Sequence, residues 1–337
     1  FTLMPTQPIK AFFLLRILSI FFSAALSQQP MKNYEKEWKK VDELTQKNLP
    51  KSALDQVKKI YSIAKKDKQD AQAIKSLLYI TNLQSQTREN NNILSIKDFE
   101  KEILSANQPA RSLLQSIVAE MYLGYFNSHR YQLYNRTNTA TFQKDDIATW
   151  TADDLHKKIG ELYLQSIKEE KLLEQTKLEP YDAIINKGNV RHLRPTLFDL
   201  LAHRALDYFK SDERDITRPA YAFEINNSSA FDPAADFIKL KFPTKDSASL
   251  QQKALLLFQK LIAFHLNDAK PDAFIDVDIE RIEFVNQKGV QSNKKELYLG
   301  ALNHIVHQYE NNPAASEAWY LIAEQYNTDA NEYKPFG

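Results

Sequence analysis

The stretch that decides the fold is Arg194-Pro-Thr-Leu-Phe-Asp-Leu-Leu-Ala-His-Arg-Ala-Leu-Asp-Tyr-Phe209. Its apolar residues follow the i, i+3, i+4 spacing of a buried helix face, and a second apolar set lies beside the first. The two sets are Leu197, Leu200, Leu201, Ala205 and Tyr208, and Phe198, Ala202, Leu206 and Phe209. A helix that is apolar around most of its circumference packs inside a larger body. The sequence therefore predicts a central, buried helix over 194–209.

This helix also carries polar residues. Thr196 and Asp199 have the spacing of a capping box, and Asp199, His203 and Asp207 follow one another at i, i+4 and i+8. An imidazole between two carboxylates can be a tuned base or a metal ligand. We favour a structural polar seam, because a buried polar group without a partner costs about 1–3 kcal/mol. His203 is accordingly predicted to contact another helix.

The rest of the chain favours an all-α fold. Its 337 residues contain only 6 glycines, and helical apolar stripes recur on both sides of the central helix. The last two stripes form a pair of about the size of a tetratricopeptide repeat unit. We expect one helical domain over 28–337, built as an irregular stack of helical hairpins of the TPR-like or α-solenoid-like kind. Its sub-blocks are about 31–137, 150–210 and 248–327, with an irregular or extended insertion around 211–247.

Several local signals predict where helices begin and end. Pro50 suits a first helical position, and Lys288-Gly289 suits a C-cap. Capping boxes are predicted at Ser95-Ile-Lys-Asp98 and at Thr151–Asp154. The helix that begins at Thr151 is expected to continue to about Leu173. The last helix follows Asn312-Pro313 and is expected to point these residues inward: Ala318, Trp319, Ile322 and Tyr326.

The N-terminal segment is predicted to be a signal peptide. An apolar run over 11–26, preceded by Lys10, has the length of a signal-peptide core, and Ala25-Leu-Ser27 supplies small residues before a cleavage at Gln28. Residues 1–27 would then be removed from an exported protein of the periplasm or the cell envelope and outer membrane. A retained membrane anchor is the alternative. Because the chain starts at Phe1 and stops at Gly337, we expect it to be a fragment of a longer reading frame.

The composition restricts which partners and which kinds of site the chain can have. A net charge of +1 gives no electrostatic reason to expect a nucleic-acid partner. The absence of cysteine excludes disulfides, thiolate metal sites and a cysteine nucleophile in this stretch, and also a lipoprotein anchor. Charged and hydrophobic fractions of 26% and 43% are ordinary for a globular protein.

Two further sets of polar residues have spacings that suggest a metal site. His304 and His307 lie three apart on one predicted helix, with Glu310 three further on, which is a spacing that can bind zinc. No HExxH motif is present, and we favour an exposed helix edge as the explanation of this trio. Asp276, Asp278 and Glu280 alternate with apolar residues but lack the glycine and glutamate of an EF-hand loop. We therefore expect no catalytic residue, no metal and no cofactor.

Five stretches together resemble a known family. They are Met31-Lys-Asn-Tyr-Glu-Lys-Glu-Trp-Lys-Lys-Val-Asp-Glu-Leu, Leu49-Pro-Lys-Ser-Ala-Leu, Asp146-Ile-Ala-Thr-Trp150, the whole of 194–209, and Asp278-Ile-Glu-Arg-Ile-Glu-Phe-Val285. In this order they resemble the N-terminal region of Bacteroidetes alpha-2-macroglobulin-like proteins.

The resemblance implies a very large exported protease inhibitor or trap, in which macroglobulin β-sandwich domains follow a helical region. Its partners would be those downstream domains and proteases, and the membrane would be met only through the signal segment. The family's bait region and thioester lie downstream, so the resemblance assigns no functional residue to these positions.

Two other readings compete. One is a self-standing TPR-like scaffold or binding protein of the periplasm or outer membrane. The other is an enzyme, which rests only on Asp199, His203 and Asp207.

Overall fold

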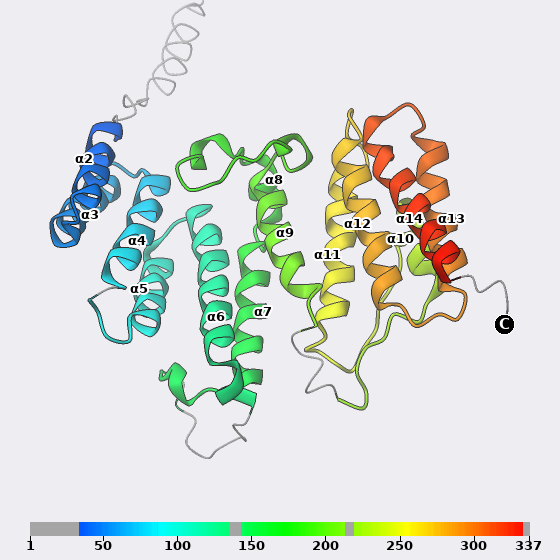
Figure 1. Ribbon diagram of the computed structural model, residues 1–337, viewed down its shortest axis with the longest axis horizontal. Coiled ribbons are helices and arrows are strands. Elements are labelled where there is room, and N and C mark those ends of the chain that lie inside the picture. Colours follow the sequence, from blue (N-terminus) through cyan, green and yellow to red (C-terminus); the bar gives the residue numbers. More distant parts are fainter. Residues whose placement is uncertain (1–33, 86, 135–142, 144, 213–218, 333–337) are drawn as a thin grey trace, which may run out of the picture.

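The fold is all-α. The computed structural model describes residues 34–85, 87–134, 143, 145–212 and 219–332, and in these ranges α-helices, turns and short 3-10 helices account for the regular structure, with no strand (Figure 1). The expected all-α class is confirmed. The predicted signal peptide over 1–27 lies outside the described residues.

The helices are numbered as in Figure 1. The first group is α2 (Glu35–Gln46), α3 (Pro50–Lys66), α4 (Asp70–Gln84), α5 (Asn91–Ser105), α6 (Ala110–Tyr134), α7 (Ala152–Ser166) and α8 (Glu170–Gln175). The second group is α9 (Leu197–Phe209), α10 (Ala234–Phe237), α11 (Leu250–His265), α12 (Asp272–Lys288), α13 (Lys294–Gln308) and α14 (Ser316–Glu332). Short 3-10 helices include η1 (Ile147–Thr149), η2 (Glu179–Tyr181), η3 (Arg191–Leu193), η5 (Ser228–Phe231) and η6 (Pro313–Ala315).

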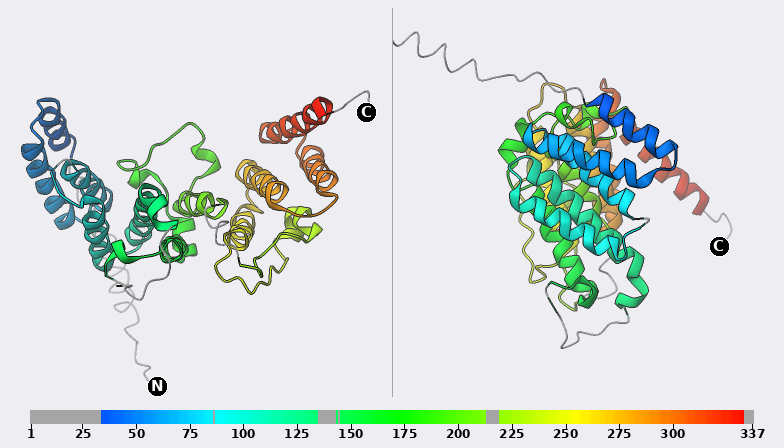
Figure 2. Two further views of the ribbon diagram at one scale, coloured as in Figure 1. Left: turned by 60° about the horizontal axis from the view of Figure 1, so that its bottom comes forward. Right: turned by 90° about the vertical axis from the view of Figure 1, so that its left-hand side faces the viewer.

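The helices follow one another through space much as they do along the chain. Closely packed pairs are sequence neighbours, among them α3 with α4, α6 with α7, α11 with α12 and α13 with α14. Figure 2 shows the resulting row, with α2 and α3 at one end and α13 and α14 at the other. A large hydrophobic core runs from α4 to α14, and a small separate one joins α2, α3 and α4.

Helix α9 lies in the middle of this row and packs on α6, α7, α8 and α11. Its apolar residues are buried, as the sequence predicts, and the helix starts where the capping box places it. The Thr196 hydroxyl accepts a hydrogen bond from the Asp199 amide at 3.3 Å, while the Asp199 carboxylate accepts from the Thr196 amide at 2.9 Å. The prediction of a buried central helix with a capping box is confirmed.

The insertion around 211–247 lies over the helical core rather than forming a sheet. Its described part holds η5 and α10, and its only strand-like feature there is an isolated bridge between Ile225 and Gly289. Phe237 and Phe242 are buried, so the segment contributes to the core.

Arg281 of α12 fixes this insertion. Its guanidinium is almost fully buried, donates to the Asp278 carboxylate at 2.8 Å and to the Ala230 carbonyl, and lies over the Phe237 ring at 4.5 Å. One side chain thus ties α12 to both η5 and α10.

Some local predictions are confirmed. Pro50 opens α3, and Thr151 with Asp154 forms a capping box at the start of α7. Gly289 is the C-cap residue of α12.

Other local predictions are wrong. Ser95 is buried within α5, which starts one turn earlier at Asn91, and Asp98 pairs with Arg88 instead. Helix α7 ends at Ser166 and does not continue to Leu173, which belongs to α8. In α14, Ala318 and Ile322 point inward as expected, but Trp319 and Tyr326 are exposed.

Replacing Arg281 with Met is expected to lower the free energy of unfolding by about 3–5 kcal/mol, because it leaves the buried Asp278 carboxylate without its partner. The double variant Asp278→Leu/Arg281→Met should lose less, since it removes both charges. Urea unfolding followed by circular dichroism measures both. As a control, Lys239→Ala on the exposed side of the insertion should stay within about 0.5 kcal/mol; a single variant as stable as this control would contradict the anchoring role.

Candidate functional site

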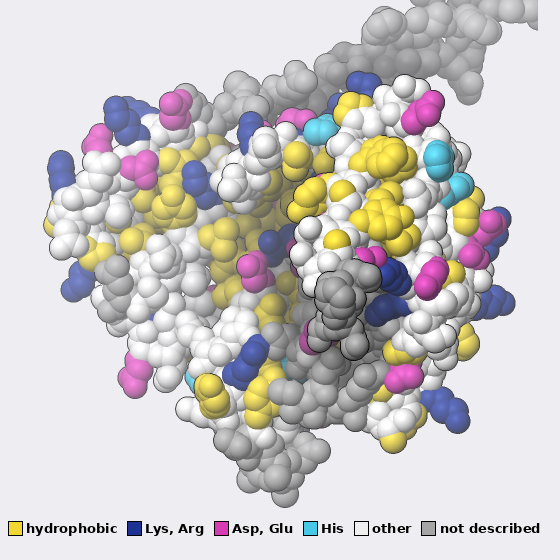
Figure 3. Space-filling view, turned by 45° about the vertical axis from the view of Figure 1, so that its right-hand side comes forward, with side chains coloured by type: hydrophobic (Ala, Val, Ile, Leu, Met, Phe, Trp, Pro, Cys, Tyr) yellow, Lys and Arg dark blue, Asp and Glu magenta, His cyan; other side chains and the backbone are white. Residues whose placement is uncertain are grey.

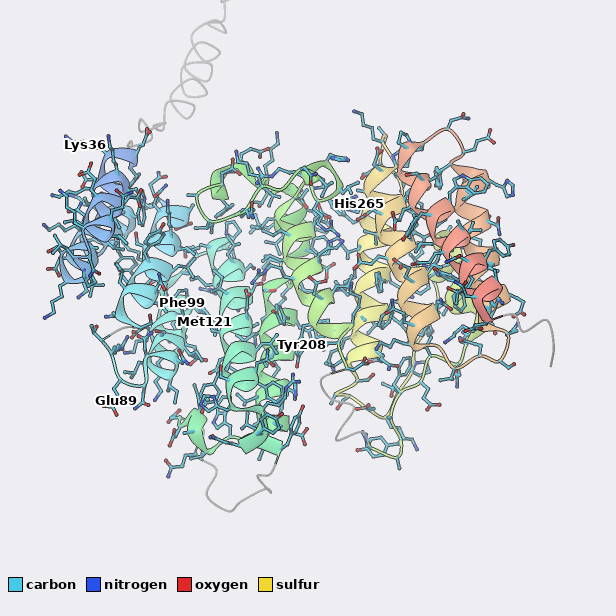
Figure 4. The ribbon with its side chains drawn as sticks, in the orientation of Figure 1. Lys36, Glu89, Phe99, Met121, Tyr208 and His265 are labelled. Carbon is cyan, nitrogen blue, oxygen red and sulfur yellow. The ribbon has the colours of Figure 1, made fainter. Side chains whose placement is uncertain are left out.

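An imidazole between two carboxylates exists in this protein, but it belongs to His265 and not to His203. His265 Nε2 lies 2.7 Å from Asp199 Oδ1, and its Nδ1 lies 2.7 Å from Asp268 Oδ2. His265 ends α11, beside the start of α9 (Figure 4). The sequence analysis missed this pairing because 66 residues separate His265 from Asp199.

The electrostatics of His265 are those of a structural link. Burial alone would lower its pKa, but hydrogen bonds and charge from Asp199 and Asp268 outweigh burial and raise the pKa. Both ring nitrogens face carboxylate oxygens, which accept hydrogen bonds when ionised, so both nitrogens carry a proton. A ring with both nitrogens engaged and almost no exposed surface has no free position for proton transfer to a substrate.

His203 contacts another helix, as predicted. Its Nδ1 lies 2.9 Å from the Asp199 carbonyl oxygen, and its Nε2 lies 3.5 Å from Glu280 Oε2 on α12. Burial lowers the pKa of His203, and the nearby Arg194 charge lowers it further, against the carboxylate of Glu280. Because a carbonyl only accepts, Nδ1 is the donor, and in the neutral ring Nε2 keeps a lone pair.

Asp207 does not join the buried seam. Its side chain is 74% exposed and pairs with Lys210 at 3.6 Å. Eight helical residues turn Asp207 by about 80° away from Asp199, whereas His203 is turned by only about 40°. The seam that the sequence predicts over Asp199, His203 and Asp207 therefore consists of Asp199 and His203.

Helix α12 brings Asp276 and Glu280 to the same side, next to His203. Asp276 Oδ2 lies 3.5 Å from Arg194, and Lys210 binds the Glu280 carboxylate. The third residue of the alternating acidic stretch, Asp278, points into the core toward Arg281. Helical geometry explains the division, because i and i+4 share a face and i+2 does not.

This side of α12 forms a groove of about 490 Å³ with η3 and the start of α14. We call it the acidic groove. Its five carboxylates are Asp272, Asp276, Glu280, Glu283 and Glu317, and its remaining walls are His192, Leu193, Arg194, Ile279, Pro313, Ala314 and Ser316.

Two carboxylates of the acidic groove, those of Glu283 and Asp276, have raised pKa values. Burial raises the pKa of Glu283, and the charges of Glu317 and Glu280 raise it further. Burial also raises the pKa of Asp276, while Arg194 and His203 act in the opposite direction. The groove is therefore a region of concentrated negative potential that a cation would relieve.

A larger cleft of about 730 Å³ lies between α5 and α7. Its floor is the stacked pair Tyr122 and Trp150, with ring centroids 5.6 Å apart. Its central groups bind one another, since Glu100 accepts from the Tyr122 hydroxyl at 3.0 Å and pairs with Lys158 at 2.8 Å. Four lysines and four carboxylates line it, so its formal charges cancel, in contrast to the acidic groove.

The three residues whose spacing could bind zinc lie on the surface. His304, His307 and Glu310 are exposed along α13 and the turn that follows it. Within the described ranges, no group of three or more His, Cys, Asp or Glu side chains is arranged to hold a metal ion.

None of the described helices is both long and apolar enough to span a bilayer. In comparisons with known proteins, no family model, no curated protein and no solved structure matches the chain.

Replacing Asp199 with Ala is expected to lower the free energy of unfolding by about 3–5 kcal/mol, because it removes a helix cap and leaves the buried His265 without one of its carboxylate partners. Asp207→Ala, on the same helix, is the matched control and should change it by no more than about 0.5 kcal/mol. Thermal and urea unfolding measure both. Equal effects would contradict the assignment of Asp199 to the buried link and of Asp207 to the surface.

The His265 link predicts a pH dependence of stability. Since its folded pKa is raised, the stabilisation is fully present below the unfolded pKa of about 6.5 and is lost as pH rises through the folded pKa. His203, whose pKa is lowered, acts in the other window and costs stability as pH falls below about 6.5. As pH rises above about 6.5, wild type should lose more unfolding free energy than His265→Gln, as measured by urea titration; parallel curves would contradict the link.

Proposed function

We propose that this chain is a non-catalytic interaction module of a large exported alpha-2-macroglobulin-like protein. It is an irregular stack of helical hairpins that docks against the macroglobulin domain following it in the same polypeptide. In this role it serves protease inhibition or trapping in the periplasm or cell envelope. The family part of the proposal rests on the sequence resemblance, and the docking part rests on the surface of α14.

The observation that carries the docking proposal is an aromatic face on the last described helix. Trp319, Tyr320 and Tyr326 of α14 are 55%, 60% and 57% exposed. Figure 3 shows hydrophobic side chains gathered on this end of the molecule. Aromatic residues bury large areas at low entropy cost and are enriched at the centres of protein interfaces. A cluster of three on one exposed helix favours a binding face.

The size of this aromatic face favours a tethered neighbour over a free partner. Three aromatic side chains exposed by just over half offer roughly 300–400 Å², well below the ~800 Å² per partner of a stable complex. A domain joined through the same chain needs less area, because the linker supplies a high effective concentration. In the family that the sequence resembles, macroglobulin domains follow the helical region.

The non-catalytic part of the proposal is supported by the state of the buried polar groups. His265 and Asp199 bind each other, and Asp278 and Arg281 do the same. Groups that hold helices together in this way are not available to a substrate.

The proposal is tested by hydroxyl-radical footprinting of the 337-residue chain and of the longer polypeptide that the proposal predicts. Trp319 and Tyr326 should be modified about threefold less in the longer protein, because docking covers them. Leu104, an exposed residue on α5, is the control and should react equally in both.

A second comparison uses the variant Trp319→Ala/Tyr326→Ala in the longer protein, which should raise proteolytic cleavage between α14 and the next domain. Equal modification of Trp319 in the two proteins would contradict docking. A reading frame that stops soon after Gly337 would instead favour a self-standing scaffold or binding protein.

A further inference from the structure

The ring of His203 lies between two hydrogen-bond acceptors, one at each of its nitrogen atoms. Nδ1 lies 2.9 Å from the carbonyl oxygen of Asp199, and Nε2 lies 3.5 Å from Oε2 of Glu280 on α12. Both Nε2 and Oε2 are enclosed, and neither has a hydrogen-bond partner among the described residues. The other oxygen of the same carboxylate, Oε1, accepts a hydrogen bond from Lys210.

A neutral ring cannot satisfy both acceptors. A neutral imidazole has one N–H and one lone pair, so either tautomer leaves a nitrogen lone pair facing an oxygen. The closer contact, with the Asp199 carbonyl, takes the N–H on Nδ1 and leaves Nε2 facing Glu280 as a second acceptor. In the imidazolium both nitrogens donate. The contact between His203 and Glu280 therefore lacks one proton.

The charges near the His203 ring act in opposite directions. Burial lowers the pKa of His203, and Arg194, just before α9, lowers it further. Glu280 and Asp199 raise it. Asp276 of α12 also interacts with the charge of the ring. Because the lowering effects prevail, the ring is neutral at about pH 7 and takes up its proton in more acidic solution than an exposed histidine does.

Titratable groups on the other helices packed on α9 bind partners other than His203. These pairs are Glu120 of α6 with Arg204, His156 of α7 with Tyr208, Glu170 of α8 with Lys260, and His265 of α11 with Asp199 and Asp268. Oε2 of Glu280 is thus the acceptor that a proton on Nε2 of His203 meets.

A bond between His203 and Glu280 would join two helices that are otherwise connected mainly through α11. Figure 1 shows α11 between α9 and α12, and α11 packs on both. Lys210 already binds Glu280 from the end of α9. His203 lies about two turns earlier on the same helix. With both bonds present, α9 would hold the carboxylate by both of its oxygens.

We propose that His203 and Glu280 form a proton-operated link between the central helix α9 and α12. In acidic solution a proton from the solvent binds the lone pair of Nε2, and the new N–H donates to Oε2 of Glu280. Nδ1 keeps its hydrogen bond to the Asp199 carbonyl. The distance of 3.5 Å should close to about 2.8 Å, the length of a charge-assisted hydrogen bond. The link involves no residue of α14 and does not depend on the docking proposed above.

The first test follows the His203 ring in nuclear magnetic resonance spectra of the ¹⁵N-labelled 337-residue protein. At about pH 7, Nδ1 should carry the proton and Nε2 should be unprotonated. As the pH falls, both nitrogens should become protonated. The new Nε2–H signal should exchange slowly with water, because this atom is enclosed and hydrogen-bonded.

The variant Glu280→Gln supplies the missing donor without a proton from the solvent. Its amide oxygen can accept from Lys210 while its amide N–H donates to Nε2 of the neutral ring. The proton affinity of His203 should fall about tenfold, because the ring loses an opposite charge and gains a donor that favours its neutral form. Asp207→Asn removes an exposed carboxylate one turn further along α9 and is the matched control. It should change the proton affinity of His203 by less than about twofold.

Three results would overturn the proposal. The first is a proton on Nε2 rather than on Nδ1 at about pH 7. The second is a His203 ring that stays neutral down to the pH at which the protein unfolds. The third is an equal effect of Glu280→Gln and Asp207→Asn on the proton affinity of His203. If Glu280→Gln does not fold, the titration of the wild-type protein decides through the first two results.

Discussion

The arrangement of the helices depends on the hydrogen bonds that the Asp199 carboxylate accepts. It is fully buried and accepts from the Thr196 amide, the Thr196 hydroxyl and His265 Nε2. A charge in this position is tolerable only because these donors surround it. The same atoms start α9 and hold α11 against it. Other polar links extend from α9, through Arg204 to Ser116 on α6 and through Lys210 to Glu280 on α12.

The parts of the fold that could be predicted from the sequence are those with a local cause. Thr196 with Asp199 and Thr151 with Asp154 form capping boxes because both partners lie within one turn, next to a strong apolar stripe. The same pattern at Ser95 and Asp98 has no such meaning, since the helix already starts at Asn91. A capping pattern decides a helix start only when no earlier start is available.

The site could be predicted only in part, because its pairs join distant segments. Asp199 and His203 were identified, but their partners His265 and Glu280 lie on other helices. The predicted place of Asp207 in the buried seam is wrong, because the helical rotation over two turns carries its side chain away from Asp199. The inward orientation expected for Trp319 and Tyr326 failed for a different reason: a spacing of helical apolar residues does not tell whether a face packs within the chain or against another body.

Two groups of polar and aromatic residues can be distinguished by what they already bind. One group is buried, and its hydrogen bonds and ion pairs hold helices together; it consists of Asp199, His265, Asp278 and Arg281. The aromatic side chains of α14 and the unpaired carboxylates of the acidic groove are at the surface. A substrate-converting site needs reactive groups that are both positioned by the fold and accessible. Among these residues the positioned groups are buried and the accessible groups lie at the surface, which supports the proposed binding role.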